Sequence, residues 1–202
     1  QASCDRLRTW GLRRPVLVYP DPAFLLFQAR PEKSTRDAIA LNLRPWPGLD
    51  RVLPVVARVC DRLVRELGCD IVYIPMQGEI DLQVGRRLQE EMEEPISLWE
   101  SLLPPAQVVS CYQRMRVALG MRLHHLIFAS CAGRPWVGIG YDPKLKALGS
   151  QMGEDGKVVP WEEITCERLW AALQDAWQRS GDAEAGYAQM QVISDLHEAA
   201  KD

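Results

Sequence analysis

The segment GMRLHHLIFASCAG, residues 120–133, places an arginine and two histidines at the start of an otherwise apolar run. Histidine titrates near neutral pH and is well suited to deliver a proton, whereas the guanidinium of Arg122 can bind phosphate or carboxylate through paired hydrogen bonds. The chain contains only three histidines, and two of them, His124 and His125, are adjacent here. These residue types indicate acid–base chemistry on an anionic ligand.

The spacing leaves open which of the two histidines faces a ligand. Two adjacent histidines are difficult to satisfy as core residues at the start of a buried helix, so we expect one of them to be accessible. Arg122 and His125 would share one face of a regular helix, but Arg122 and His124 can converge on a ligand in an irregular first turn. The unpaired N–H groups and positive dipole end of such a helix also favour an anion.

Short apolar runs alternate with longer amphipathic segments, which predicts an α/β fold. Residues 69–76 have the pattern of a buried strand, and residues 48–68 have the apolar spacing of a helix that stops at Gly68. Strands joined by helices of this length imply a Rossmann-like, mostly parallel sheet with helices on both faces, followed by a helical C-terminal tail. The other predicted strands are 15–19, 38–46, 94–100, 115–121 and 134–142, and the other predicted helices are 81–92, 103–113, 120–133 and 142–153.

Polar residues follow several predicted strands and are the candidates for a site. In an open parallel sheet, ligands bind at the carboxyl ends of the strands. The residues at these positions are Asn42, Arg44, Trp46, Gln77, Asp81, Arg122, His124, Tyr141, Asp142 and Lys144. Such a set suits an anion that carries both phosphate and carboxylate. Taken singly, Arg44 could pair with a surface carboxylate, Asp142 could cap a helix and Lys144 could be solvated.

The composition excludes several classes of function. The net charge of −3 and the scattered lysines and arginines give no footprint for nucleic acid. No apolar run reaches the roughly 20 residues of a transmembrane segment and no signal-peptide pattern is present, so we expect a cytoplasmic protein. The six cysteines are far apart, which predicts reduced, mostly buried thiols and no metal site.

Four motifs together resemble one family, the polysaccharide pyruvyl transferases, in particular the bacterial branch that pyruvylates secondary cell-wall polymers. The motifs are DPAFLL (21–26), LNLRPW (41–46), IPMQ (74–77) with the later Asp81, and GMRLHHLIFASCAGRPWVGIGYDPK (120–144). The resemblance extends over roughly two thirds of the chain. Two positions depart from it: His125 stands where relatives usually have a small residue, and Gly140 where serine is common.

The resemblance implies a two-domain architecture of the GT-B type, with a cleft between two Rossmann-like halves. The chain would correspond to the C-terminal half, so that the other wall of the cleft lies outside it. Residues 1–36 would be a remnant of the preceding domain and a linker, residues 37–165 the Rossmann-like donor-binding domain, and residues 166–202 the C-terminal helices.

The resemblance also implies an activity: transfer of the pyruvyl group of phosphoenolpyruvate to two hydroxyls of one sugar, which forms a cyclic ketal and releases phosphate. By the RLH and LRPW matches, Arg122, Leu123, His124 and Arg44 would bind phosphoenolpyruvate, and His124 would be the general acid–base residue. Further candidates are Gln77, His125, Tyr141 and Lys144. The acceptor would be an aminosugar-containing glycan of a cell-wall precursor, and no cofactor is expected. A lipid-linked acceptor would place the enzyme peripherally at the inner face of the membrane.

Two other classes of function remain open from the sequence. A sugar-nucleotide glycosyltransferase or epimerase of GT-B type would need contacts to a base and a ribose, but the chain has no GxGxxG motif. A non-catalytic anion-binding domain is the second alternative. Helices in 166–202 could bind a partner or pack back on the domain, and His197 is expected at the surface.

Overall fold

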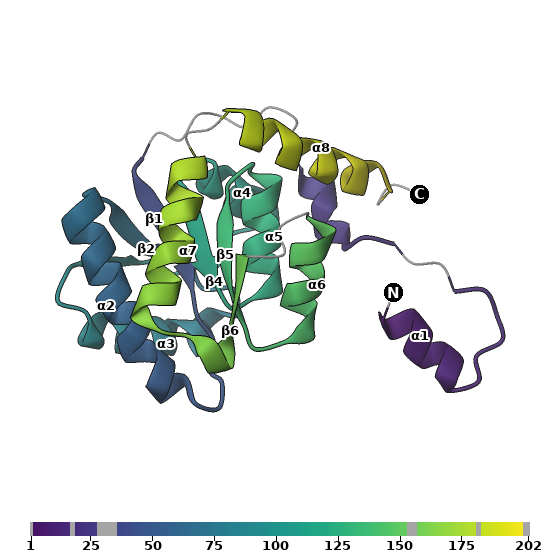
Figure 1. The fold of residues 1–202 in the computed structure, drawn as a ribbon, viewed down its shortest axis with the longest axis horizontal. Helices are drawn as coiled ribbons and strands as arrows, with labels where there is room; N and C mark the ends of the chain where they lie inside the picture. Colours follow the sequence, from purple (N-terminus) through teal and green to yellow (C-terminus); the bar gives the residue numbers. More distant parts are fainter. Residues whose placement is uncertain (1, 17–18, 28–35, 153–156, 181–182, 200–202) are drawn as a thin grey trace.

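The computed structural model describes residues 2–16, 19–27, 36–152, 157–180 and 183–199. Its centre is a sheet of six strands in the order β3-β2-β1-β4-β5-β6, and every neighbouring pair is parallel (Figure 1). The strands are β1 (Ala38–Asn42), β2 (Asp70–Tyr73), β3 (Ile96–Leu98), β4 (Val117–Gly120), β5 (Trp136–Gly140) and β6 (Val158–Pro160). The predicted Rossmann-like parallel sheet is therefore confirmed.

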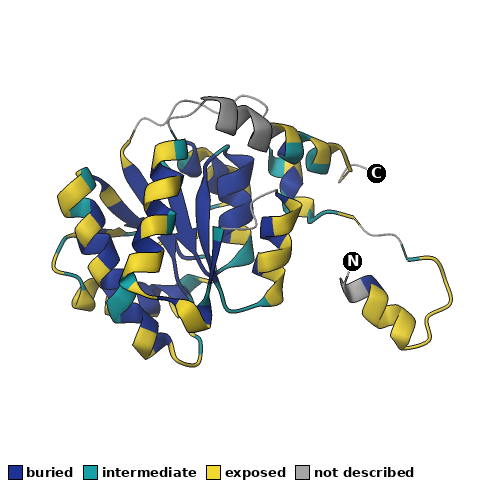
Figure 2. Ribbon diagram, viewed as in Figure 1, coloured by how far each residue is buried: buried dark blue, intermediate teal, exposed yellow. Residues whose placement is uncertain are grey.

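Helices cover both faces of the sheet, and the strands between them are buried (Figure 2). One face is covered by α2 (Leu49–Leu67), α3 (Gly78–Glu91) and α7 (Cys166–Arg179). The other is covered by α4 (Pro105–Tyr112), α5 (Leu123–Cys131), α6 (Pro143–Gln151), α8 (Ala183–Ala199) and the 3₁₀ turn η1 (Pro22–Leu26). The other elements of the described residues are α1 (Ala2–Thr9), which lies apart from the sheet in Figure 1, and the 3₁₀ turn η3 (Trp161–Glu163).

The core has one part on each face of the sheet, and both parts follow from the sequence pattern. All five residues of β1 are buried because a parallel sheet with two covered faces has no polar side. Leu41 and Leu43 enter the core beneath α2, whereas Ala38 and Ala40 face α4 and α5. As predicted, α2 stops at Gly68, which adopts the left-handed conformation with φ of 62° and donates its N–H to the carbonyl of Val64.

Besides shifts of a few residues at the ends of other elements, three features differ from the prediction. Within 15–19, Pro15, Val16 and Tyr19 are not in a strand, because a strand needs a hydrogen-bonded neighbour and this segment lies outside the sheet; positions 17 and 18 fall outside the described residues. The first strand ends at Asn42 rather than at residue 46, where the chain turns toward α2. The short edge strand β6 was not predicted.

Both C-terminal helices pack back on the sheet domain. Trp170, Leu173 and Trp177 of α7 belong to the core beneath α2, and Ile193 of α8 is fully buried on the other face. The expectation of a surface position for His197 is wrong. Its side chain is 19% exposed, and its Nδ1 lies 2.9 Å from the carbonyl oxygen of Phe24, because α8 lies across η1.

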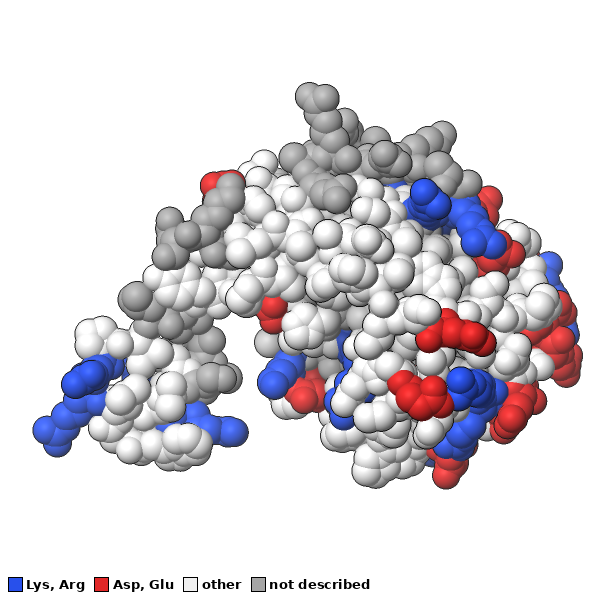
Figure 3. Space-filling view, turned by 180° about the vertical axis from the view of Figure 1, so that it is seen from behind, with Lys and Arg blue, Asp and Glu red and all other residues white. Residues whose placement is uncertain are grey.

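Charges of both signs are mixed on the surface of the sheet domain. Figure 3 shows Lys and Arg side chains interspersed with Asp and Glu over this domain, without a large patch of one sign on the face in view. Ion pairs on the surface of this domain include Arg86 with Glu79 and Arg65 with Glu93. None of the described helices has the length and apolar character needed to cross a membrane.

Candidate functional site

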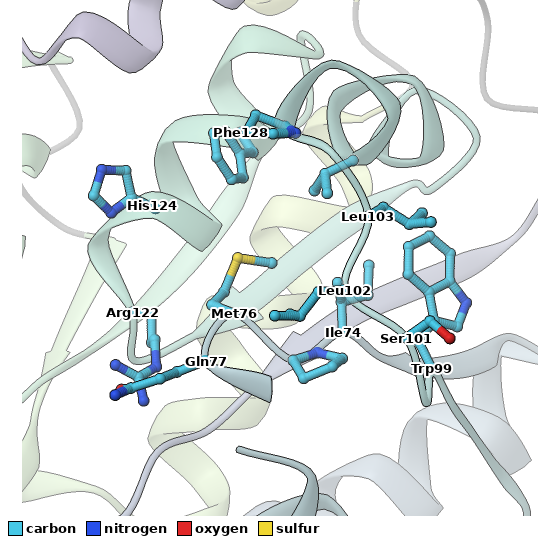
Figure 4. Close-up of a pocket in the computed structure, with 13 residues that line it drawn as sticks. Ile74, Met76, Gln77, Trp99, Ser101, Leu102, Leu103, Arg122, His124 and Phe128 are labelled. Atoms are coloured by element: carbon cyan, nitrogen blue, oxygen red, sulfur yellow. The ribbon is translucent and has the colours of Figure 1, made fainter. Parts of the chain in front are cut away.

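A pocket of about 370 Å³ lies at the carboxyl ends of β2, β3 and β4. It brings together three residues predicted from the sequence, Gln77, Arg122 and His124, which lie at one side of the pocket in Figure 4. The loop after β3 supplies the apolar walls Trp99, Leu102 and Leu103, with further contacts from Met76 and Phe128. Sequence reasoning missed this loop because it carries no charged group of the expected kind.

Arg122 is held by a buried ion pair. It follows β4 and is the N-cap residue of α5, where its backbone is extended. Its Nε and Nη2 donate to both carboxylate oxygens of Asp81, with Nε 2.9 Å from Oδ2. The Asp81 side chain is 0% exposed and that of Arg122 is 15% exposed. The guanidinium therefore has one orientation, and only Nη1 lacks a hydrogen bond to the described residues.

Asp81 is itself fixed by the end of β2 and by β1. Its Oδ2 accepts the backbone N–H groups of Met76 and Gln77 at 2.9 and 3.0 Å. The side-chain amide of Asn42 donates to the carbonyl of Ile74 at 2.9 Å and to Oδ2 of Asp81 at 3.3 Å. Asn42, at the end of β1, and Asp81, in the first turn of α3, thus support Arg122 and do not line the pocket.

His124 lies on the first turn of α5, and its side chain is 57% exposed. The imidazole lies beside Phe128, with ring centroids 6.0 Å apart, and its Nε2 is 3.6 Å from Oδ2 of Asp21. Leu123, the residue between Arg122 and His124, packs against the core on the α5 side of the sheet. His124 is therefore the accessible member of the histidine pair.

His125 points the other way and is completely buried. Its Nδ1 bonds to the hydroxyl of Tyr112, and its ring lies directly over Gly120. A Cβ at position 120 would approach the ring carbon Cδ2 to 2.3 Å, so only glycine fits beneath the imidazole. Burial lowers the pKa of His125 to about 3. The residue does not line the pocket.

Burial of His125 predicts a loss of stability in acid. Because its folded pKa of about 3 lies below the unfolded value near 6.5, the unfolded state binds more protons as the pH falls. This contribution is complete above pH 6.5 and is lost progressively toward pH 3, by about 2 kcal/mol at pH 5. Urea unfolding of the chain at pH 7 and pH 5 measures it. His125→Asn keeps an acceptor for Tyr112 and should show a smaller difference; an unchanged difference would contradict the assignment.

Arg44 and Tyr141 form a second cluster at the ends of β1 and β5, and neither residue lines the pocket. Arg44 Nη1 donates to the hydroxyl of Tyr141 at 3.0 Å, and the guanidinium lies 5.6 and 5.3 Å from the ring centroids of Trp46 and Tyr141. Asn42 of β1 and Gly120 of β4 are register partners in neighbouring strands. Arg44 and Arg122 each lie two residues beyond this pair. Their backbones leave the sheet at the same level.

Lys144 lies in a different place. Asp142 caps α6 by accepting the N–H of Lys144 at 2.8 Å, as one of the two sequence interpretations had it. Lys144 lines a separate pocket of about 580 Å³ together with Arg6 and Trp10 from the α1 region. Within the described ranges, no group of three His, Cys, Asp or Glu side chains could hold a metal ion, and the six cysteines form no disulfide.

The sequence of the chain matches the family described as polysaccharide pyruvyl transferase over residues 1–143 of 202. The chain belongs to this family. The match includes both β1 with the following Arg44 and the segment with Arg122 and His124. Among proteins of curated function, none matches the chain in sequence.

Solved structures similar to this pyruvyl transferase family member are GT-B glycosyltransferases. A mutant O-GlcNAc transferase from Thermobaculum terrenum is 15% identical with a TM-score of 0.54, over 85% of this chain and 34% of that protein. The glycosyltransferase SnogD from Streptomyces nogalater is 17% identical with a TM-score of 0.50, over 98% of this chain and 60% of that protein. The chain therefore has a GT-B-type domain fold and spans less than two thirds of the length of these neighbours.

Proposed function

We propose that the protein transfers the pyruvyl group of phosphoenolpyruvate to a sugar of a cell-wall polysaccharide precursor, as a cyclic ketal. The observation that supports this most directly is the placement of an oriented guanidinium, Arg122, and an accessible imidazole, His124, on one pocket of a pyruvyl transferase family member. The first group suits an anionic donor and the second suits proton delivery.

The reaction needs an acid because the enol ether of phosphoenolpyruvate is not electrophilic by itself. A proton delivered by His124 to the methylene carbon makes C2 oxocarbenium-like, and a sugar hydroxyl attacks C2 and loses its proton. The C–O bond to phosphate then breaks, and the second hydroxyl of the same sugar attacks C2 and loses its proton. One proton becomes part of the new methyl group, and one leaves with the phosphate.

The donor is proposed to bind through two guanidinium groups and the backbone N–H groups at the start of α5. Nη1 of Arg122 and the backbone N–H groups of the first turn of α5, at Leu123 and His124, face a negative charge. Arg44 leaves the neighbouring strand at the same level and supplies the second guanidinium, oriented by Tyr141. Phosphate and carboxylate would thus each have one arginine.

The acceptor is proposed to be an aminosugar-containing glycan. The apolar face of a sugar ring can pack on the indole of Trp99, which lines the pocket. Gln77 lines the same pocket and can form a hydrogen bond with a sugar hydroxyl. A lipid-linked glycan would bring the enzyme to the inner face of the cytoplasmic membrane. Lys144 lines the separate pocket and is a candidate for contacts with groups that do not belong to this chain.

The GT-B fold is also compatible with a sugar nucleotide as the donor, which is the alternative function. Isothermal calorimetry on the full-length protein with phosphoenolpyruvate and with UDP-sugars separates the two. Binding of phosphoenolpyruvate but not of the nucleotide is expected. Tight binding of a UDP-sugar alone would favour a glycosyltransferase or epimerase, and anion binding without turnover would favour a non-catalytic domain.

The decisive test is an activity assay. The full-length protein is incubated with phosphoenolpyruvate and a panel of aminosugar glycans, and phosphate release is measured together with the mass of the glycan. Release of one phosphate for each pyruvyl ketal gained is expected. Phosphate release without a change in glycan mass would contradict the proposed transfer.

A further inference from the structure

The segment before the sheet brings a carboxylate to His124. Asp21 lies next to η1, far from His124 in the sequence, yet its Oδ2 is 3.6 Å from Nε2 of the imidazole. Its other oxygen, Oδ1, accepts the N–H of Ala23 at 2.9 Å and caps the 3₁₀ turn. The carboxylate therefore has one oxygen fixed by the backbone and the other directed at the histidine.

The position of Asp21 is determined by contacts on both sides of η1. Phe24 is 1% exposed and belongs to the core on the α5 side of the sheet. The thiol of Cys131, at the end of α5, donates to the carbonyl of Ala23 at 3.5 Å, and His197 of α8 bonds to the carbonyl of Phe24 at 2.9 Å. The turn that carries Asp21 is thus held by the same helix that carries His124 and by α8.

Asp21 has no competing partner in the cations that line the pocket. Arg122, the N-cap residue of α5, is already paired with the buried carboxylate of Asp81. The two acidic residues therefore contact different groups: Asp81 fixes the guanidinium of Arg122, and Asp21 faces the imidazole of His124.

We propose that Asp21 is the positioning residue of His124. With its Oδ2 3.6 Å from Nε2, the carboxylate favours the tautomer that carries a proton on Nε2 and holds the ring in one orientation. Nδ1 is then the nitrogen that carries the proton transferred to the methylene carbon of phosphoenolpyruvate. This inference rests on the proposed function, because it assigns the geometry of the acid in that reaction.

The test compares Asp21→Asn with the wild type in the full-length protein. Asparagine keeps an oxygen for the cap of η1, so the fold should be retained, but the negative charge is lost. We expect kcat to fall by about tenfold or more with KM for phosphoenolpyruvate unchanged, a smaller loss than for a fully buried aspartate–histidine pair. The ¹⁵N chemical shifts of histidine-labelled protein, with the His124 signals identified by their absence in His124→Ala, should show loss of the Nε2–H tautomer.

Two variants complete the test. Asp21→Glu restores a carboxylate and should recover part of the lost kcat. Asp175→Asn removes a carboxylate from α7, on the opposite face of the sheet, and should change neither kcat nor the His124 signals. If Asp21→Asn keeps the wild-type kcat and ¹⁵N shifts while His124→Ala is inactive, the role of Asp21 is overturned but the proposed function is not. Wild-type activity of His124→Ala would overturn the proposed acid itself.

Discussion

Replacing His124 by alanine is expected to lower kcat for pyruvyl transfer by about 10² to 10⁴, the usual contribution of a positioned acid–base group. The side chain is 57% exposed at the pocket, so its removal leaves no cavity in the core. The free energy of unfolding should therefore stay close to that of the wild type. Steady-state phosphate release by the full-length protein, together with urea unfolding, measures both quantities.

Binding of phosphoenolpyruvate should survive in His124→Ala, since the guanidinium of Arg122 and the N-terminus of α5 remain. Calorimetry with the donor alone checks this point. A variant that turns over at the wild-type rate would exclude His124 as the acid. Inactivity confined to His125→Asn would then point to the neighbouring histidine, although that side chain is buried against Tyr112.

Replacing Arg122 by methionine is expected to reduce both donor affinity and stability. The change leaves the carboxylate of Asp81 buried, 0% exposed, and without its cation. Breaking a buried ion pair in this way typically costs about 3–5 kcal/mol. Urea unfolding should show this loss, and calorimetry should show weaker binding of phosphoenolpyruvate.

A second substitution separates the two effects of Arg122. In the double variant Asp81→Asn with Arg122→Met, the buried group is neutral and can still accept the N–H groups of Met76 and Gln77, so most of the stability should return. Donor affinity should stay low, because the guanidinium is still absent. Arg36→Met is the control: it breaks a half-exposed pair with Asp70 and should cost less than about 1 kcal/mol. Wild-type donor affinity in the double variant would show that Arg122 acts only in folding.

Local sequence signals predicted the elements whose causes are themselves local. Apolar spacing and a glycine in the left-handed region define α2 and its end at Gly68, and the alternation of runs predicts the parallel sheet. Of the residues that the strand-end rule predicted, Gln77, Arg122 and His124 line one pocket, whereas the other candidates do not line it. Segment 15–19 has strand-like residues but no neighbouring strand, and pairing is not encoded in the segment itself.

By itself, the sequence determined the fold class and the family, and it indicated that the candidate site lies at the carboxyl ends of the strands. Only the tertiary structure decided which histidine is accessible, because the choice depends on the ring of His125 packing over Gly120 and meeting Tyr112. Likewise, the partners Asp81 of Arg122 and Asp21 of His124 come from other elements. Such contacts form when crossovers bring distant segments together, and residue spacing carries no record of them.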